Sequence, residues 1–148
     1  MRRAGGPVLG WCLLAAPLAG QAPGPGSVTV TITGIRAEQA GTLLVALYDR
    51  ASAWLILDSA RAVRRIPVAA DSAIAAFDSL PADTGYAIVV IHDRNGNGRL
   101  DMRWFPFPRP KEGSGVSNDH VRMGKPSYDD ARFAVSGAAR SMRIRLRY

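Results

Sequence analysis

The chain has 148 residues, 47% of them hydrophobic, and one cysteine. That length fits one domain with enough apolar material for one core. A single cysteine excludes a disulfide framework and a thiolate zinc cage, and two histidines argue against a multi-histidine metal centre. The formal charge is +7, from 19 basic and 12 acidic residues.

The N-terminal segment has the features of a secretory signal peptide. Arg2 and Arg3 form a basic start, an apolar run spans 8–19, and small residues follow it. The run is shorter than the roughly 20 apolar residues that a membrane-spanning helix needs. The alternative, a buried N-terminal helix, fits poorly with the prolines and glycines of this segment. We therefore expect a signal peptide over 1–22, a flexible leader over 23–26, a secreted or periplasmic protein, and no transmembrane span in the mature chain.

Seven short segments in the rest of the chain have strand character. Segment 27–33 alternates β-branched apolar residues with threonine, and 86–91 is a continuous apolar run that predicts a central strand. The expected strands are 27–33, 41–48, 63–68, 72–77, 86–91, 132–135 and 142–148. Seven strands without a long amphipathic helix predict an all-β fold, an antiparallel β-sandwich of Ig-like or transthyretin-like type, formed by a single domain over 27–148.

The segments between these strands are turns and one long loop. We expect a helical turn within 51–57 and a short turn over 127–130 that begins with Ser127 as its N-cap. Segment 102–131 is predicted to be a long connection with little regular structure before the last two strands. A connection of that length indicates a function or a loop folded around an ion.

The last predicted strand alternates apolar residues with Arg143, Arg145 and Arg147. Without Arg2 and Arg3 of the expected signal peptide, the chain keeps 17 basic and 12 acidic residues and a charge of +5. Export removes the usual nucleic-acid partners. We therefore expect no nucleic-acid partner and interpret these arginines as the solvated face of an edge strand, where charge also blocks association between sheet edges.

The segment directly after 86–91 has the spacing of an EF-hand-type calcium loop. Oxygen-bearing side chains stand at loop positions 1, 3, 5 and 9, which are Asp93, Asn95, Asn97 and Asp101. Gly98 at position 6 permits the positive φ that the sharp turn needs. Arg99 at position 7 is expected to offer its backbone carbonyl while its side chain faces water, and Leu100 is expected to pack on the core.

The loop also departs from the EF-hand pattern. Position 12 is Trp104 instead of a bidentate glutamate, and Arg94 adds a positive charge that lowers cation affinity. Either Glu112 or Asp119 is expected to complete the metal shell, and spacing does not choose between them. The alternative is an Asn-Gly turn that only reverses the chain. We predict calcium, because a simple turn does not need the two carboxylates that bracket the amides.

Three aromatic residues, Trp104, Phe105 and Phe107, gather beside this loop. One interpretation is a flat platform for a sugar ring or a proline-rich strand. That interpretation makes the protein a carbohydrate-binding accessory domain that acts through Trp104 and Phe107. The other interpretation is that the rings seal the end of the sandwich beneath the long loop.

Residues that would support catalysis are few. His92 and His120 flank the loop region, so a hydrolase that uses either histidine with an acidic partner is a further hypothesis. Ser114 lacks the strand–turn–helix context of a nucleophile elbow. We assign no catalytic residue. The expected function is a non-enzymatic extracytoplasmic binding or structural module whose ligand is a glycan or a protein.

The motifs together resemble an exported bacterial family, domain of unknown function 2141. The residues that carry the resemblance are Gly41–Tyr48, Gly85–Ala87, His92–Asp101, Pro110–Gly113, Ser117–Asn118, Gly124, Pro126–Ala131 and Phe133. The resemblance implies a small secreted or periplasmic β-sandwich and brings no established activity. The sequence departs from the family at Arg94, where the family tends to be acidic, and at Val116, where it tends to be aromatic.

Overall fold

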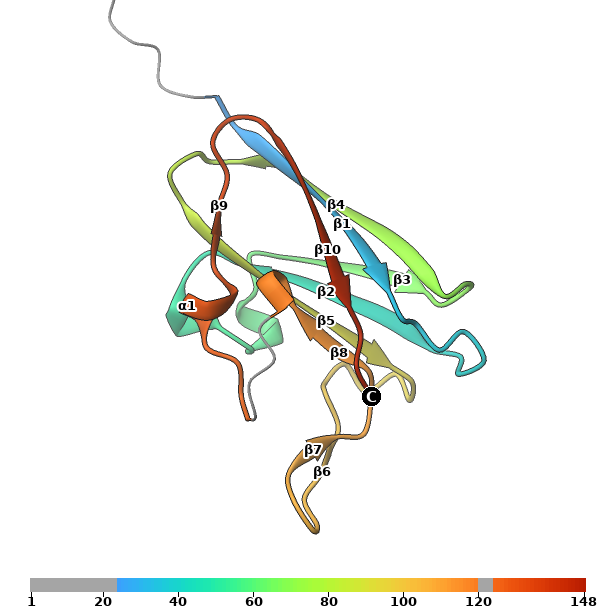
Figure 1. Cartoon of the computed structure of the whole chain (residues 1–148). Helices are drawn as coiled ribbons and strands as arrows, with labels where there is room; N and C mark the ends of the chain where they lie inside the picture. The colour runs from blue at the N-terminus through green and yellow to red at the C-terminus, as the bar shows by residue number, and fades with distance from the viewer. Residues whose placement is uncertain (1–23, 120–123) are drawn as a thin grey trace, which may run out of the picture.

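The computed structural model describes residues 24–119 and 124–148, so the expected signal peptide and His120 lie outside the described residues. Two sheets form the body, a three-stranded sheet β10-β1-β4 and a five-stranded sheet β3-β2-β5-β8 in which β9 also pairs with β5 (Figure 1). The strands of the body are β1 (Gly26–Thr33), β2 (Thr42–Tyr48), β3 (Ala62–Pro67), β4 (Ser72–Leu80), β5 (Gly85–Asp93), β8 (Ser114–Val116), β9 (Phe133–Ala134) and β10 (Ala139–Arg145).

The predicted all-β sandwich is confirmed, with one departure in strand direction. The described pairings are antiparallel except that of β1 with β10, which is parallel from Ser27 opposite Ala139 to Thr33 opposite Arg145. Strand β10 lies at the edge of its sheet, as expected for the arginine-rich strand. It spans Ala139–Arg145, so the predicted range 142–148 was wrong at both ends.

The main core lies between the two sheets, which Figure 1 shows as two layers. Alternate residues of each strand point into it, and their relative exposure is 0% for most of them. The inward residues of β1, β2 and β5 are Val28, Val30, Ile32, Leu43, Val45, Leu47, Tyr86, Ile88 and Val90. Their burial supplies the apolar driving force that keeps the two sheets stacked.

A second apolar cluster covers the outer face of the five-stranded sheet. Leu44, Val89 and Ile91 point away from the main core and are buried beneath segments outside the sheet. The Trp54 ring packs edge-on against Tyr48, with ring centroids 5.2 Å apart. Because both faces of β2 and β5 are buried, their sequences are continuous apolar runs without alternation. The covering segment holds two short 3₁₀ helices, η1 (Ala51–Ala53) and η2 (Leu57–Ser59), in place of the single predicted turn.

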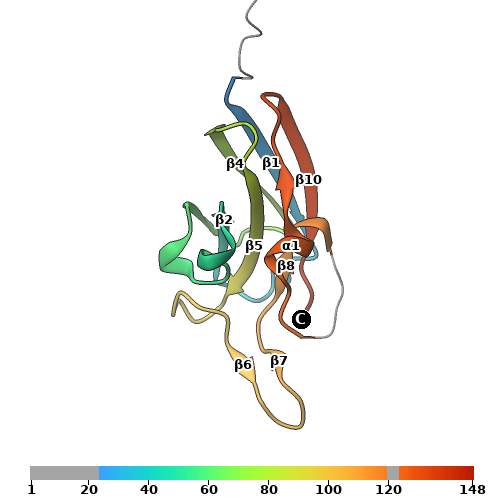
Figure 2. The ribbon, with the colours of Figure 1, turned by 90° about the vertical axis from the view of Figure 1, so that its left-hand side faces the viewer.

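Segment 102–131 contains more regular structure than predicted. Strands β6 (Met102–Arg103) and β7 (Arg109–Pro110) form a hairpin that projects away from both sheets (Figures 1 and 2). Strand β8 adds to the edge of β5, and the 3₁₀ helix η3 (Ser117–Asp119) and helix α1 (Tyr128–Ala131) follow. The predicted cap of α1 is confirmed, because the Ser127 hydroxyl oxygen accepts a hydrogen bond from the Asp130 N–H at 3.1 Å. The long connection therefore consists of short elements joined by irregular segments.

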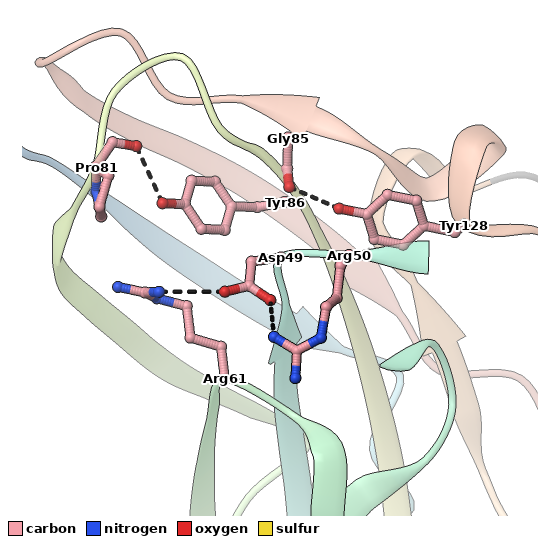
Figure 3. Close-up of polar contacts among 7 residues, drawn as sticks. All are labelled: Asp49, Arg50, Arg61, Pro81, Gly85, Tyr86 and Tyr128. Atoms are coloured by element: carbon pink, nitrogen blue, oxygen red, sulfur yellow. Dashed lines mark hydrogen bonds and ion pairs between the residues drawn. The ribbon is translucent and has the colours of Figure 1, made fainter. Parts of the chain in front are cut away.

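Phenolic hydroxyls close the first end of β5 (Figure 3). Tyr128 donates a hydrogen bond to the Gly85 carbonyl at 2.6 Å, and Tyr86 donates to the Pro81 carbonyl at 3.0 Å. Asp49, the residue after the neighbouring strand β2, forms ion pairs with Arg50 and Arg61 at 3.1 Å each. No helix among the described residues is long and apolar enough to cross a membrane.

Candidate metal centre and aromatic hairpin

Asp93 organises the loop that follows β5. Its side chain is buried, with a residue exposure of 3%. One carboxylate oxygen accepts hydrogen bonds from the N–H groups of Gly96 and Asn97 at 2.8 and 3.2 Å, and the other accepts from Gly98 at 2.8 Å. The chain therefore wraps around the carboxylate at loop position 1. Gly96 and Gly98 have φ values of 73° and 74°, which confirms the left-handed conformation predicted at position 6.

The side chains at positions 3, 5 and 9 of the loop meet one another. The side-chain amides of Asn95 and Asn97 donate to the two carboxylate oxygens of Asp101 at 2.8 and 2.9 Å. The side-chain oxygens of the same asparagines accept from the backbone N–H groups of Asn97 and Arg99. The structure thus brings together the side chains at three polar positions that the sequence singled out, close to buried Asp93.

Glu112 holds the two ends of the loop together. It is 2% exposed, and its two oxygens accept hydrogen bonds from the backbone N–H groups of Arg94 at 2.9 Å and Asp101 at 3.1 Å. Asp119, the other candidate for completing the shell, instead forms an ion pair with Arg147 at 3.1 Å. Of the two candidates, Glu112 is the one that contacts the loop.

Two acidic side chains of this region are buried and the basic ones are exposed. The carboxylates of Asp93 and Glu112 face inward, whereas Arg94 and Arg99 are exposed. The exposed Arg99 side chain is as predicted. Leu100 is partly buried against the second apolar cluster, which confirms the predicted packing.

The donor set of the loop consists of two aspartates and two asparagines plus a backbone carbonyl. Across residues 24–119 and 124–148, no group of three or more histidine, cysteine, aspartate or glutamate residues is placed to hold a metal ion. A cation in this loop would therefore rely on amide and backbone oxygens in addition to Asp93 and Asp101. Such neutral oxygens suit calcium, which accepts six to eight oxygen ligands in flexible geometry.

The aromatic residues sit on the tip of the β6–β7 hairpin. Trp104, Phe105 and Phe107 are 72%, 85% and 76% exposed. The expectation that these rings seal the end of the sandwich is therefore wrong. The hairpin begins directly after Asp101 and returns just before Glu112, where the Lys111 N–H donates to the Asp101 carbonyl at 2.8 Å. Loop 93–101 and the β6–β7 hairpin therefore meet at Asp101, directly before the hairpin begins.

His92 lies in the interior and not on the surface. It is 0% exposed, and its Nδ1 lies 2.7 Å from the Tyr148 hydroxyl. Its Nε2 is buried without a hydrogen-bond partner. The Tyr148 ring packs where any side chain at Gly113 would stand, since a Cβ there would lie 2.5 Å from the ring. Sequence reasoning missed this contact, because Gly113 and Tyr148 are distant in the chain and only the fold brings them together.

The comparisons with known proteins support one family and nothing finer. A family model described as an uncharacterized protein conserved in bacteria (DUF2141) matches residues 30–143. No curated protein and no solved structure matches the chain. The matched range runs from within β1 to within β10 and includes loop 93–101 and the β6–β7 hairpin. The chain therefore belongs to the family of uncharacterized bacterial proteins DUF2141.

Proposed function

We propose that the chain is an exported, non-enzymatic binding module that acts in the periplasm or outside the cell and holds one calcium ion in the loop 93–101. The observation that carries the calcium proposal is the convergence of Asn95, Asn97 and Asp101 beside the buried carboxylate of Asp93. Extracytoplasmic calcium is abundant enough to fill a site of moderate affinity.

The donor set fits calcium after one local change. In this structure the amide nitrogens of Asn95 and Asn97 face Asp101. A half-turn of each amide about its terminal bond would present the oxygen in place of the nitrogen. It would give up the hydrogen bonds from the Asn97 and Arg99 N–H groups, and the cation would compensate for them. Two carboxylates, two amide oxygens and the Arg99 carbonyl would then leave room for water ligands.

The test is a thermal melt in calcium, in magnesium and in chelator. Binding to the folded state alone adds RT ln(1 + [Ca]/Kd) to stability, about 2.7 kcal/mol when calcium is at about 100 times Kd. The melting temperature should rise by several degrees. Magnesium should substitute poorly, because it requires near-ideal octahedral geometry at about 2.1 Å.

Two variants test the proposed ligands, each compared in calcium and in chelator so that its effect on loop folding is measured without the cation. Asp93→Ala should abolish the calcium increment because it removes the carboxylate at position 1. Asn97→Asp should enlarge the increment because it adds a third negative charge to the loop. Equal melting temperatures in all three buffers would contradict the proposal and leave loop 93–101 as a turn.

A second candidate function, carbohydrate binding, is favoured by the exposure of Trp104 and Phe107. A glycan array probed with the chain and with its Trp104→Ala variant tests it. Binding that is lost in the variant supports a carbohydrate-binding module, and absence of binding contradicts it. The hydrolase hypothesis receives no support from His92, whose imidazole is buried.

Export of the chain is tested by cell fractionation. Recovery outside the cytoplasm of a chain that begins shortly after residue 20 would support removal of the expected signal peptide over 1–22. Recovery of the intact N-terminus from the cytoplasm would contradict it.

A further inference from the structure

We propose that the tip of the β6–β7 hairpin docks on a membrane, with Trp104, Phe105 and Phe107 inserted into the interface of an anionic phospholipid bilayer. The proposal concerns the hairpin and goes beyond the calcium loop. It does not require that the loop hold a cation.

Exposed apolar surface is concentrated at this tip. Among the described residues, five large hydrophobic side chains are exposed, and three of them are Trp104, Phe105 and Phe107. The other two are Ile56, just before η2, and Ile74, on β4, which are 53% and 67% exposed. Single exposed apolar residues are ordinary, whereas a cluster marks an interaction surface. The hairpin projects beyond both sheets, so nothing in the body obstructs its approach to a flat partner (Figures 1 and 2).

Positive charge surrounds the tip. Arg103 and Arg109 stand opposite each other at the base of the tip, and Lys111 follows the end of β7. All three are exposed, and residues 102–111 contain no acidic side chain. Of the two bordering carboxylates, that of Glu112 is buried and turned toward backbone N–H groups, and that of Asp101 accepts hydrogen bonds from Asn95 and Asn97. The hairpin therefore presents basic groups outward, and an anionic lipid surface attracts such groups.

The composition of the tip favours lipid over a sugar. Residues 104–108 read Trp-Phe-Pro-Phe-Pro, so the indole N–H is their only polar side-chain group. A sugar platform needs neighbouring hydrogen-bond partners, and the tip offers few. Pro106 and Pro108 also lack backbone N–H groups. Because these two N–H groups are absent, moving the tip backbone from water into the membrane costs less free energy. Each N–H group without a hydrogen-bond partner is costly in lipid. Tryptophan itself is enriched at membrane interfaces.

The form of the tip also argues against a small-molecule pocket. Two adjoining surface hollows, of about 410 and 350 Å³, are both lined by Gly34 and Arg145 near the end of β10. Neither hollow is lined by a residue of 104–108. The tip is a protruding apolar surface, which is better suited to insertion into a membrane than to enclosing a small molecule.

The test measures co-sedimentation with vesicles. The exported form of the chain, with its N-terminus mapped by mass spectrometry, is mixed with vesicles of phosphatidylglycerol and phosphatidylcholine in equal parts or of phosphatidylcholine alone. We expect binding to the mixed vesicles, weaker binding to phosphatidylcholine, and a decline with added salt. The variant Trp104→Ser/Phe105→Ser/Phe107→Ser should lose more than about tenfold in partition coefficient.

Matched controls assign the effect to the tip. The variant Ile56→Ser/Ile74→Ser removes the other exposed apolar side chains and should bind as the unaltered chain does. Arg103→Gln should weaken binding to mixed vesicles about fivefold. Arg65→Gln, which removes an exposed arginine on β3, should have a smaller effect. Thermal melts show whether each variant is folded.

A spectroscopic measurement detects insertion directly. Brominated lipid should quench Trp104 fluorescence, and Trp104→Phe should retain binding but lose this quenching, because Trp54 is buried. Equal vesicle binding by the triple-serine variant would overturn the proposal. So would binding to a glycan array without binding to anionic vesicles. Each vesicle-binding measurement is repeated in chelator. Membrane binding by the hairpin is then tested independently of calcium binding by loop 93–101.

Discussion

The two ends of strand β5 are held by opposite chemistry. At Gly85, neutral phenolic hydroxyls donate to backbone carbonyls, with Tyr128 on Gly85 and Tyr86 on Pro81 (Figure 3). At Asp93, buried carboxylates accept from backbone N–H groups, three on Asp93 and two on Glu112. At the Gly85 end, side-chain donors satisfy backbone carbonyls. At the Asp93 end, side-chain acceptors satisfy backbone N–H groups.

The difference shows how each end responds to its surroundings. A neutral hydroxyl that is hydrogen-bonded is inexpensive to bury, whereas a buried carboxylate depends on several donors or on a cation. The Gly85 end should therefore be weakened by alkali, because Tyr128 and Tyr48, which lies opposite Ala87, have raised pKa values. The Asp93 end should be weakened by loss of a carboxylate and is the end suited to a cation. Three measurements sharpen or break this comparison.

The largest expected effect is that of Glu112→Gln. Glutamine has the same shape but only one acceptor oxygen, so its NH₂ group would face a backbone N–H of Arg94 or Asp101. We expect a loss of about 3 kcal/mol in the free energy of unfolding, measured by urea denaturation in chelator. Glu38→Gln is the matched control because Glu38 is exposed. A loss as small as that of the control would contradict the idea that Glu112 clamps the loop.

The second effect is destabilisation in alkali. Burial raises the pKa of Tyr48 from 10.0 to about 12. Burial, and then the charge of Asp49, also raise the pKa of Tyr128. Below pH 10 both folded and unfolded chains keep these protons. Between pH 10 and 12 the unfolded chain releases the Tyr48 proton first, so stability falls, by about 2 kcal/mol.

The variant Tyr48→Phe checks that assignment. Its urea unfolding free energy should fall less steeply between pH 10 and 12 than that of the unaltered chain, because the ionisable hydroxyl is gone. Tyrosinate absorbance of the folded chain gives an independent reading. Identical pH slopes for the two chains would show that Tyr48 does not control alkaline stability.

The smallest effect is that of Tyr128→Phe at neutral pH. The change removes one hydroxyl and leaves the Gly85 carbonyl without the donor that now lies 2.6 Å away. We expect a loss of about 1 kcal/mol in urea unfolding, typical of one neutral hydrogen bond. Tyr86→Phe should cost a similar amount, since its hydroxyl donates at 3.0 Å. If neither variant differs from the unaltered chain, the hydroxyls do not secure this end of β5.

The parts of the fold that were predicted have local signals. Segment 86–91 is β-branched and apolar throughout, and it lies within the central strand β5 as expected. Its continuous burial is explained by two covering layers, which the apolar pattern itself indicates. The Ser127 cap was also recognisable, because its hydrogen-bonded partner Asp130 lies three residues away.

The missed parts depend on contacts between distant segments. Strand β8 pairs with β5, yet Ser114–Val116 is short and has no alternating pattern. The parallel pairing of β10 with β1 has no local signal either, since an edge strand of the same composition fits in either direction. Exposure of the aromatic tip was equally undetermined, because large aromatic residues are more often buried.

At the candidate metal centre, the sequence by itself determined the inner geometry of the loop. The bonds from Gly96, Asn97 and Gly98 to Asp93 span three to five residues, so the order of side chains and glycines suffices to specify them. Only the tertiary structure decided that Glu112 and not Asp119 joins the loop, and that the neighbouring hairpin points its aromatic rings outward. Those outcomes depend on how β8 docks against β5, and no short-range pattern encodes the meeting of two remote segments.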